Sequence, residues 1–181
     1  SLEPAKNIKV SLNNTQSALN ITWDKAIGIT GYQIEIYKEI DVLENDFSNP
    51  EKLQTNTKST SNSLSISQME RGNYYVYVRT KRTNELSSRG NGVKFYISPI
   101  TEITLNKTSL GMIVGQTETI TATVNPNDTN FNKSITWSSS NEDVATVDDE
   151  GNVTSHSLGN AIIYAESVNG ITATCSIVVS Y

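Results

Sequence analysis

Hydrophobic and polar residues alternate along most of the chain in short runs that end at turn-forming residues. The clearest example is ITWSSSNEDVATVDDEGNVT, residues 135–154. Successive side chains of a strand point to opposite faces, so Ile135 and Trp137 share one face. Ser, Asn and Asp residues then interrupt the run, because they hydrogen-bond their own backbone. Residues 144–147 resume an extended run, and Gly151 allows a second turn with positive φ. The pattern predicts a β-domain.

Residues 4–97 show about seven such runs, at the spacing of a β-sandwich. Trp23 follows the phase of Leu19 and Ile21, and Tyr32 that of Ile34, so both aromatic residues are predicted to lie in a core. The expected strands cover residues 7–12, 18–23, 31–38, 52–57, 64–66, 74–82 and 92–96.

This first part of the chain resembles a fibronectin type III domain. The resemblance rests on Pro4, on Trp23 and on the run YQIEI at residues 32–36. MERGNYYVYV, residues 69–78, also looks like the family's L-x-P-G-x-x-Y-x-V-x-V, although it is one residue short and lacks the proline. Either Tyr74 or Tyr75 could then be the corner tyrosine. We choose Tyr74, which shares its face with two valines and is predicted to be buried.

Residues 100–181 resemble the bacterial immunoglobulin-like domain of group 2 from end to end. The family's core pattern, v-t-W-s-S-s-n-x-x-v-A-t-V-d-x-x-G-x-V-t, matches residues 135–154 nearly residue for residue. Trp137 is therefore expected in the core, and so is Cys175, which is in phase with Ile177 and Val179. We predict an all-β protein of two tandem Ig-like β-sandwich domains, residues 1–97 and 98–181.

The two predicted domains are joined by the segment YISPI, residues 96–100, which contains no glycine. Pro99 restrains itself and Ser98 toward extended conformations. The sequence therefore predicts a short, stiff link and an elongated rod.

Charge is distributed unevenly along the chain. Residues 1–97 carry 12 Lys and Arg against 10 Asp and Glu, whereas residues 98–181 carry 2 against 9. An acidic half repels phosphate backbones, so no nucleic-acid partner is expected. No apolar run is long enough to insert into a membrane. Because Ser1 opens the chain without a signal peptide, we expect a fragment excised from a larger secreted or cell-wall protein.

Few residues suggest chemistry. The single histidine, His156, lies in a polar turn, and one His with one Cys provides too few ligands for a tetrahedral zinc site. We therefore predict no catalytic residue and no cofactor. Calcium takes six to eight oxygen ligands, some of which the acidic turns could supply. The weak calcium candidates are Asp143, Asp148, Asp149 and Glu150, and the alternative is that they are solvated turn residues.

The candidate ligand face of the first domain consists of Tyr37, Tyr75 and Tyr77. Antiparallel pairing of residues 31–38 with 74–82 would place Tyr37 beside Tyr75 on the solvent face, with Glu35 beside Tyr77 and Gln33 near Arg79. Exposed tyrosines suit stacking on sugars, although cross-strand aromatic pairs also stabilise sheets by themselves.

Residues 88–91, SRGN, occupy the place where some fibronectin type III domains carry an integrin-binding Arg-Gly-Asp. Here Asn91 stands in place of the acid and lacks the charge that would bind a metal ion. Integrin binding by this route is therefore not predicted.

By resemblance, such modules belong to secreted or cell-wall proteins, large extracellular hydrolases, adhesins and phage tails. We expect a monomeric, non-catalytic spacer within a secreted or cell-surface multimodular bacterial protein, with other domains of the same polypeptide as its partners. The alternatives are a module that binds cell-wall or host carbohydrate or a host surface, and a decoration domain of a phage tail protein.

Overall fold

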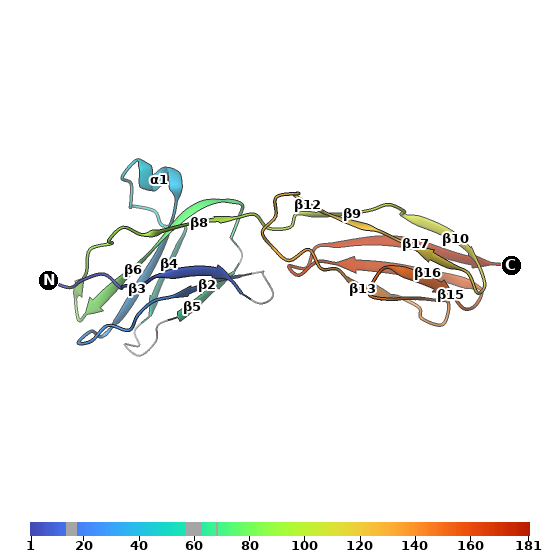
Figure 1. Ribbon diagram of the computed structural model, residues 1–181, viewed down its shortest axis with the longest axis horizontal. Helices are drawn as coiled ribbons and strands as arrows, with labels where there is room; N and C mark the ends of the chain where they lie inside the picture. Colours follow the sequence, from blue (N-terminus) through green and yellow to red (C-terminus); the bar gives the residue numbers. More distant parts are fainter. Residues whose placement is uncertain (14–17, 57–62, 68) are drawn as a thin grey trace. The chain divides into compact units, whose positions relative to one another are not determined.

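The computed structural model describes residues 1–13, 18–56, 63–67 and 69–181 (Figure 1). The chain divides into two compact units, Ser1–Ser98 (unit 1) and Pro99–Tyr181 (unit 2). Their boundary lies one residue beyond the one that the sequence indicates. Both units are built from β-strands, which confirms the predicted all-β class.

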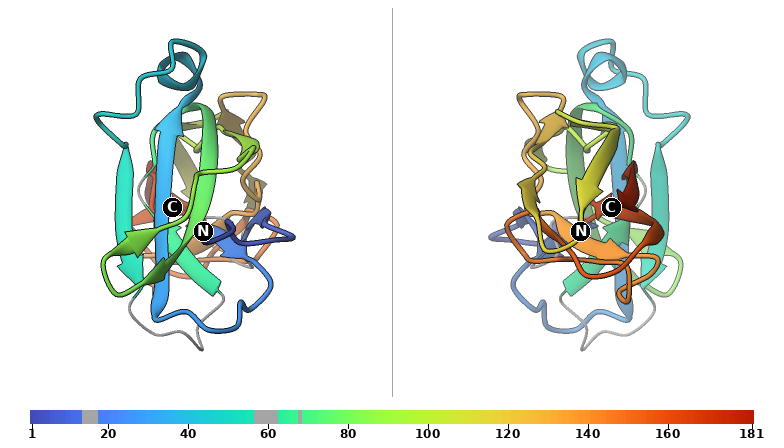
Figure 2. Two further views of the ribbon diagram at one scale, coloured as in Figure 1. Left: turned by 90° about the vertical axis from the view of Figure 1, so that its left-hand side faces the viewer. Right: turned by 90° about the vertical axis from the view of Figure 1, so that its right-hand side faces the viewer.

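The described residues of unit 1 form two sheets and one short helix. The first sheet contains β1 (Lys9–Leu12), β2 (Ala18–Thr22) and β5 (Ser63–Ser67). In the second, β4 (Lys52–Asn56), β3 (Gly31–Lys38) and β6 (Gly72–Arg82) lie in that order, and both β7 (Glu85–Leu86) and β8 (Val93–Ile97) pair with β6. Helix α1 (Glu39–Leu43) continues directly from β3 and lies beyond the end of the sheet (Figure 2). Residue 57, the last of a predicted strand, lies outside the described residues.

The core of unit 1 is formed by alternate residues of neighbouring strands, as the period of two requires. Trp23, Tyr32 and Tyr74 are all buried, which confirms their predicted place in the core. The rings of Trp23 and Tyr32 meet edge to face, with centroids 5.1 Å apart. The Tyr74 hydroxyl donates a hydrogen bond to the backbone carbonyl oxygen of Glu70 at 2.8 Å, so Tyr74 is the corner tyrosine.

Unit 2 contains a four-stranded sheet in the order β10 (Ser109–Ile113), β17 (Thr172–Ser180), β16 (Gly159–Glu166) and β13 (Thr136–Ser139). A three-stranded sheet joins β11 (Thr117–Thr119), β15 (Asn152–Ser155) and β14 (Ala145–Val147). Strands β9 (Glu102–Leu105) and β12 (Ala122–Asn125) form a further pair. All these pairings are antiparallel except β10 with β17, which is parallel.

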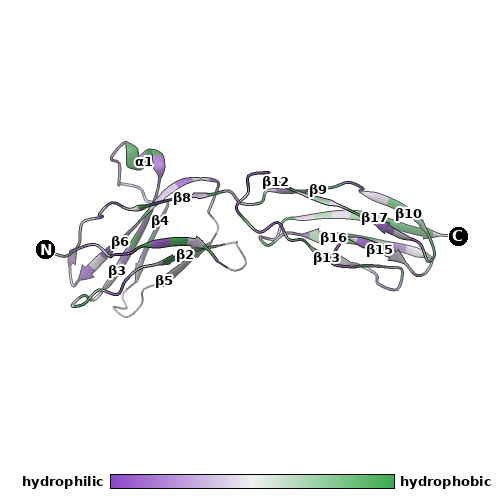
Figure 3. Cartoon of the chain, viewed as in Figure 1, coloured by the Kyte–Doolittle hydropathy of each residue, from purple (hydrophilic) through white to green (hydrophobic). Residues whose placement is uncertain are grey.

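The core of unit 2 includes Cys175, whose side chain is fully buried as predicted. Trp137 differs from the prediction, because it is only partly buried and packs against the core from its margin. The reason is its place on β13, which has a strand neighbour on one side only. Hydrophobic and hydrophilic residues alternate along the strands (Figure 3). Within the described part of the chain, no helix is long and apolar enough to span a membrane.

Candidate functional site

The register of β3 and β6 places the proposed tyrosine face as the sequence predicts. Tyr37 lies opposite Tyr75, Glu35 opposite Tyr77, and Gln33 opposite Arg79. This register brings several polar and aromatic side chains of unit 1 onto one face of its larger sheet.

That face is covered, however, so the predicted solvent-exposed ligand face is wrong. Tyr37 and Tyr77 are only 2% and 3% exposed, and Tyr75 alone of the three is partly exposed. In the segment after α1, the ring of Phe47 lies 5.1 Å from that of Tyr37 and 5.8 Å from that of Tyr77. Residues 41–50 are mostly polar, but their one aromatic residue, Phe47, covers the two tyrosines.

Glu35, which sequence reasoning also placed on the solvent face, is 1% exposed and stands at the centre of a hydrogen-bond network. Its Oε1 accepts hydrogen bonds from the Tyr37 hydroxyl and from Arg89 Nε, both at 2.7 Å. Its Oε2 accepts from Gln33 Nε2 at 3.0 Å and from Arg79 Nη1 at 3.1 Å. We call these five residues the Glu35 cluster. Each carboxylate oxygen has two donors, which offsets the cost of burying the charge.

The network also sets the protonation states of the Glu35 cluster. Burial raises the pKa of Glu35, but the four donors outweigh burial and hold that pKa below its usual range. Burial and the nearby Glu35 carboxylate raise the pKa of the Tyr37 hydroxyl. Glu35 is therefore an ionised acceptor at neutral pH, and its lone pairs are already used by the chain. This arrangement is suited to holding segments together rather than to transferring protons.

Arg89 links the Glu35 cluster to the covering segment. Its guanidinium lies over the ring of Phe47, 4.5 Å from the centroid, while its Nε is bonded to Glu35. Arg79 Nε donates to the backbone carbonyl oxygen of Ser87 at 2.8 Å. The cluster thus fastens β3, β6, the segment before β8 and the segment after α1 to one another.

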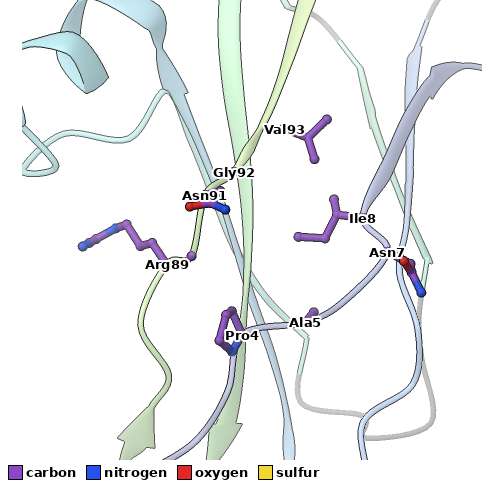
Figure 4. Close-up of a pocket in the computed structure, with 9 residues that line it drawn as sticks. Pro4, Ala5, Asn7, Ile8, Arg89, Asn91, Gly92 and Val93 are labelled. Atoms are coloured by element: carbon purple, nitrogen blue, oxygen red, sulfur yellow. The ribbon is translucent and has the colours of Figure 1, made fainter.

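Next to the Glu35 cluster is an open hollow of about 300 Å³. It lies between residues 89–93 and the start of the chain, where it is lined by Pro4, Ala5, Asn7 and Ile8 (Figure 4). Arg89 extends away from the hollow, toward Glu35, although it contributes to the lining. Gly92 has φ +68°, and a Cβ there would lie 2.6 Å from the ring of Tyr77. The turn before β8 therefore requires glycine at this position.

The weak calcium candidates in unit 2 are not brought together. Asp148 Oδ1 accepts hydrogen bonds from the backbone N–H groups of Glu150 and Asn152, and its Oδ2 accepts one from Asn152 Nδ2. Hydrogen bonds from Asn152 and Glu150 lower the pKa of Asp148. Nowhere in the described ranges do three or more His, Cys, Asp or Glu side chains gather as metal ligands. Asp143, Asp148, Asp149 and Glu150 are therefore turn residues, and Asp148 uses its oxygens to close its own turn.

The remaining chemistry-bearing side chains of unit 2 are also engaged within the fold. His156 Nε2 lies 2.7 Å from the hydroxyl of Thr146, and burial raises the pKa of the Cys175 thiol.

Residues 99–176, most of unit 2, match the family model of the bacterial Ig-like domain (group 2). Unit 2 is a group 2 bacterial Ig-like domain. This confirms the resemblance on which the sequence prediction rests.

Several curated proteins are similar to part of this chain. An uncharacterized protein of Clostridium acetobutylicum is 41% identical over 80 residues, which are 44% of this chain and 8% of that protein. The minor capsid protein of Enterobacteria phage T3 is 39% identical over 80 residues, 44% of this chain and 18% of that protein. The chain thus spans less than a fifth of the length of either relative. A two-domain fibronectin type III segment of chicken tenascin is 13% identical, with a TM-score of 0.42 over 96% of this chain and 97% of that one.

Proposed function

We propose that the chain is a non-catalytic structural segment, a load-bearing spacer, within a larger extracellular bacterial protein. Group 2 bacterial Ig-like domains occur in extracellular bacterial proteins, and Ig-like and fibronectin type III domains are generally non-catalytic. The carboxylates of Glu35 and Asp148 accept hydrogen bonds from the chain's own donors. These contacts support a role in holding the fold.

The observation that carries the proposal is the parallel pairing of β10 with β17 in unit 2. Five residue pairs join the strands, from Ser109 with Ser176 to Ile113 with Ser180. β10 lies near the start of the unit and β17 at its end, so a pull on the two ends drives these strands past each other in opposite directions. Hydrogen bonds between them are then loaded together rather than one at a time. This is the geometry that a load-bearing spacer needs.

The spacer proposal is tested by replacement in the full-length protein that contains this chain. One variant lacks residues 1–181, and a second carries an unrelated tandem of two β-sandwich domains in their place. A spacer predicts that the replacement retains the activity or surface display of the parent protein, whereas the deletion reduces it. Loss of function in the replacement variant, with normal expression and folding, would show that specific surface contacts of this chain are needed.

A second candidate function is a decoration domain of a phage particle, favoured by the similarity of part of this chain to the minor capsid protein of phage T3. The candidates differ in where the parent protein is found. Antibodies raised against this chain would label purified virions in the phage case and the bacterial surface or culture medium in the other.

Carbohydrate binding loses its original support because Tyr37 and Tyr77 are covered by Phe47. It remains an outcome that the replacement experiment detects, since a binding module cannot be exchanged for an unrelated sandwich.

A further inference from the structure

Two asparagines in the chain are followed directly by glycine, Asn91 before Gly92 and Asn169 before Gly170. Such a pair is chemically labile because glycine has no Cβ to hinder the approach of its backbone nitrogen to the preceding side chain. The two pairs lie in turns of different units and differ in how the fold engages them.

In the pair at Asn169, both reacting groups, the side-chain amide of Asn169 and the backbone N–H of Gly170, form hydrogen bonds within the fold. Asn169 Oδ1 accepts a hydrogen bond from the Ser167 hydroxyl at 2.6 Å, and its Nδ2 donates to the backbone carbonyl oxygen of Ile100 at 2.8 Å. The attacking nitrogen is occupied as well, since the Gly170 N–H donates to the carbonyl oxygen of Ser167 at 3.1 Å. The side chain must break these bonds before it can react.

The pair at Asn91 is open. Asn91 is exposed, and among the described residues no hydrogen bond engages its side-chain amide or the backbone N–H of Gly92. It lies in the turn before β8, at the rim of the hollow between residues 89–93 and the chain start (Figure 4). Both of its neighbours, Gly90 and Gly92, are glycines with positive φ. The turn therefore has no Cβ on either side of Asn91.

We propose that Asn91 is a site of spontaneous deamidation, which places a new carboxylate in the loop between β7 and β8. The backbone nitrogen of Gly92 attacks Cγ of Asn91 and loses its proton, while the Cγ–Nδ2 bond breaks and ammonia leaves. The product is a five-membered succinimide. Water then opens the ring at one of its two carbonyls and yields aspartate or isoaspartate. The sum is asparagine plus water to acid plus ammonia, with no change of oxidation state.

The consequence is a charge change beside an arginine that the fold already positions. Residues 89–91 then read Arg-Gly-Asp, or Arg-Gly-isoAsp with the chain continuing through the side chain. The new carboxylate adds a second anion near Arg89, which is bonded to Glu35 in the unmodified chain. Deamidation thus alters a loop that contributes both to the Glu35 cluster and to the hollow.

The test is incubation of the folded chain in mildly alkaline buffer, followed by peptide mapping with mass spectrometry and an isoaspartate assay. We expect Asn91 to convert to the acid roughly tenfold faster than Asn169, because the bonds that hold Asn169 must break first. The same chain in concentrated urea provides the internal control, since unfolding exposes both pairs and should bring their rates together.

Two variants sharpen the result. Asn91→Gln should abolish the fast conversion and leave the slow one unchanged. Ser167→Ala, which removes the donor to Asn169 Oδ1, should raise the rate at Asn169 in the folded chain. Equal rates at the two sites before unfolding, or faster conversion at Asn169, would overturn the proposal. So would the absence of conversion at Asn91 while the unfolded chain reacts.

Discussion

The hydroxyl of Tyr74 donates a hydrogen bond to the backbone carbonyl oxygen of Glu70, four residues earlier and 2.8 Å away. The bond closes the corner that leads into β6, and it does so although the corner is one residue short and has Arg71 where the fibronectin pattern has proline. The tyrosine rather than the proline therefore maintains this corner.

Tyr74→Phe should destabilise unit 1 by about 1–3 kcal/mol, because it leaves the Glu70 carbonyl without its donor while keeping the buried ring. Urea denaturation followed by circular dichroism measures the loss. Tyr75→Phe is the matched control on the same strand: its hydroxyl makes no hydrogen bond within the described residues, so the change should be within about 0.5 kcal/mol. Equal losses in the two variants would contradict the assignment of Tyr74 as the corner tyrosine.

Glu35→Gln should cost about 2–3 kcal/mol of unfolding free energy. It removes the shared counter-charge of Arg79 and Arg89, and breaking a buried pair usually costs more. The expected loss is smaller here because the side chains of Arg79 and Arg89 are 17% and 31% exposed, so water screens the two ion pairs. Glu39→Gln is the control, since Glu39 pairs with Lys94 near the surface and should contribute at most about 1 kcal/mol. A loss no larger than that of the control would show that the Glu35 cluster does not hold unit 1 together.

The same carboxylate should make stability depend on pH. The folded-state pKa of Glu35 lies below its ordinary value of 4.5: burial raises it, but the hydrogen bonds of the cluster lower it further. A carboxyl group of this kind binds fewer protons in the folded state, so its contribution is complete above that ordinary value and is lost as the pH falls through the folded-state pKa. Urea denaturation at several pH values gives the free energy of unfolding as a function of pH. Between about pH 5 and pH 2 this free energy should fall more steeply for the unmodified chain than for Glu35→Gln. The same pH dependence of the unfolding free energy in both proteins would count against a depressed pKa of Glu35.

The sequence predicts the strands and their register well, but it does not predict which segments cover the outer face of the sheet. The observed pairing of Tyr37 with Tyr75 agrees with the alternation of both strands, because a shift by one residue would turn every core side chain to the wrong face. Alternation does not say what lies over the outer face, and here Phe47 and Arg89 cover it from segments outside the two strands. Arg89 is 54 residues from Glu35 in the sequence, so no local pattern could have joined them.

Trp137 illustrates a related limit. Its phase with Ile135 correctly places it on the inner face, but the depth of burial depends on whether β13 has neighbours on both sides. That is a property of the sheet order, which the residues of one strand do not contain. The acidic turns of unit 2 show a similar limit, because the sequence lists the carboxylates but not the hydrogen bonds by which Asp148 closes its own turn.

The two tryptophans should therefore differ in their contribution to stability. Trp23→Ala should cost about 3–5 kcal/mol, since the side chain is 2% exposed and packs against Tyr32, whereas Trp137→Ala should cost less, about 1–3 kcal/mol. Circular dichroism follows both units, and the fluorescence of the remaining tryptophan reports the unit that was not changed. A greater loss for Trp137 than for Trp23 would reverse this ranking.

Mechanical stability should differ between the units. In unit 2 the parallel β10–β17 pairs are loaded together by a pull on the ends, whereas in unit 1 both β1 and β8 pair antiparallel with their neighbours. Single-molecule pulling of the tandem should give two unfolding events, with unit 1 first and unit 2 at the higher force. The gain in length identifies each unit. Unfolding of unit 2 at the lower force would contradict the load-bearing role proposed for it.

Gly115 and Gly151 offer a test of packing at constant backbone geometry, because both have φ +82°. Alanine at Gly115 meets no atom within 4 Å, so Gly115→Ala should cost only the positive-φ penalty, about 1–2 kcal/mol. At Gly151 the added Cβ would clash with the backbone oxygen of Ile120 and lie 3.0 Å from the Trp137 ring. The backbone at Ile120, directly after β11, cannot move away from Gly151 without breaking the hydrogen bond from the Ile120 N–H to the Gly151 carbonyl oxygen. Gly151→Ala should therefore cost about 3–5 kcal/mol, the sum of the same penalty and an overpacking term. Urea denaturation of the two variants isolates that term as their difference, and a difference near zero would mean that Gly151 is required for its φ alone.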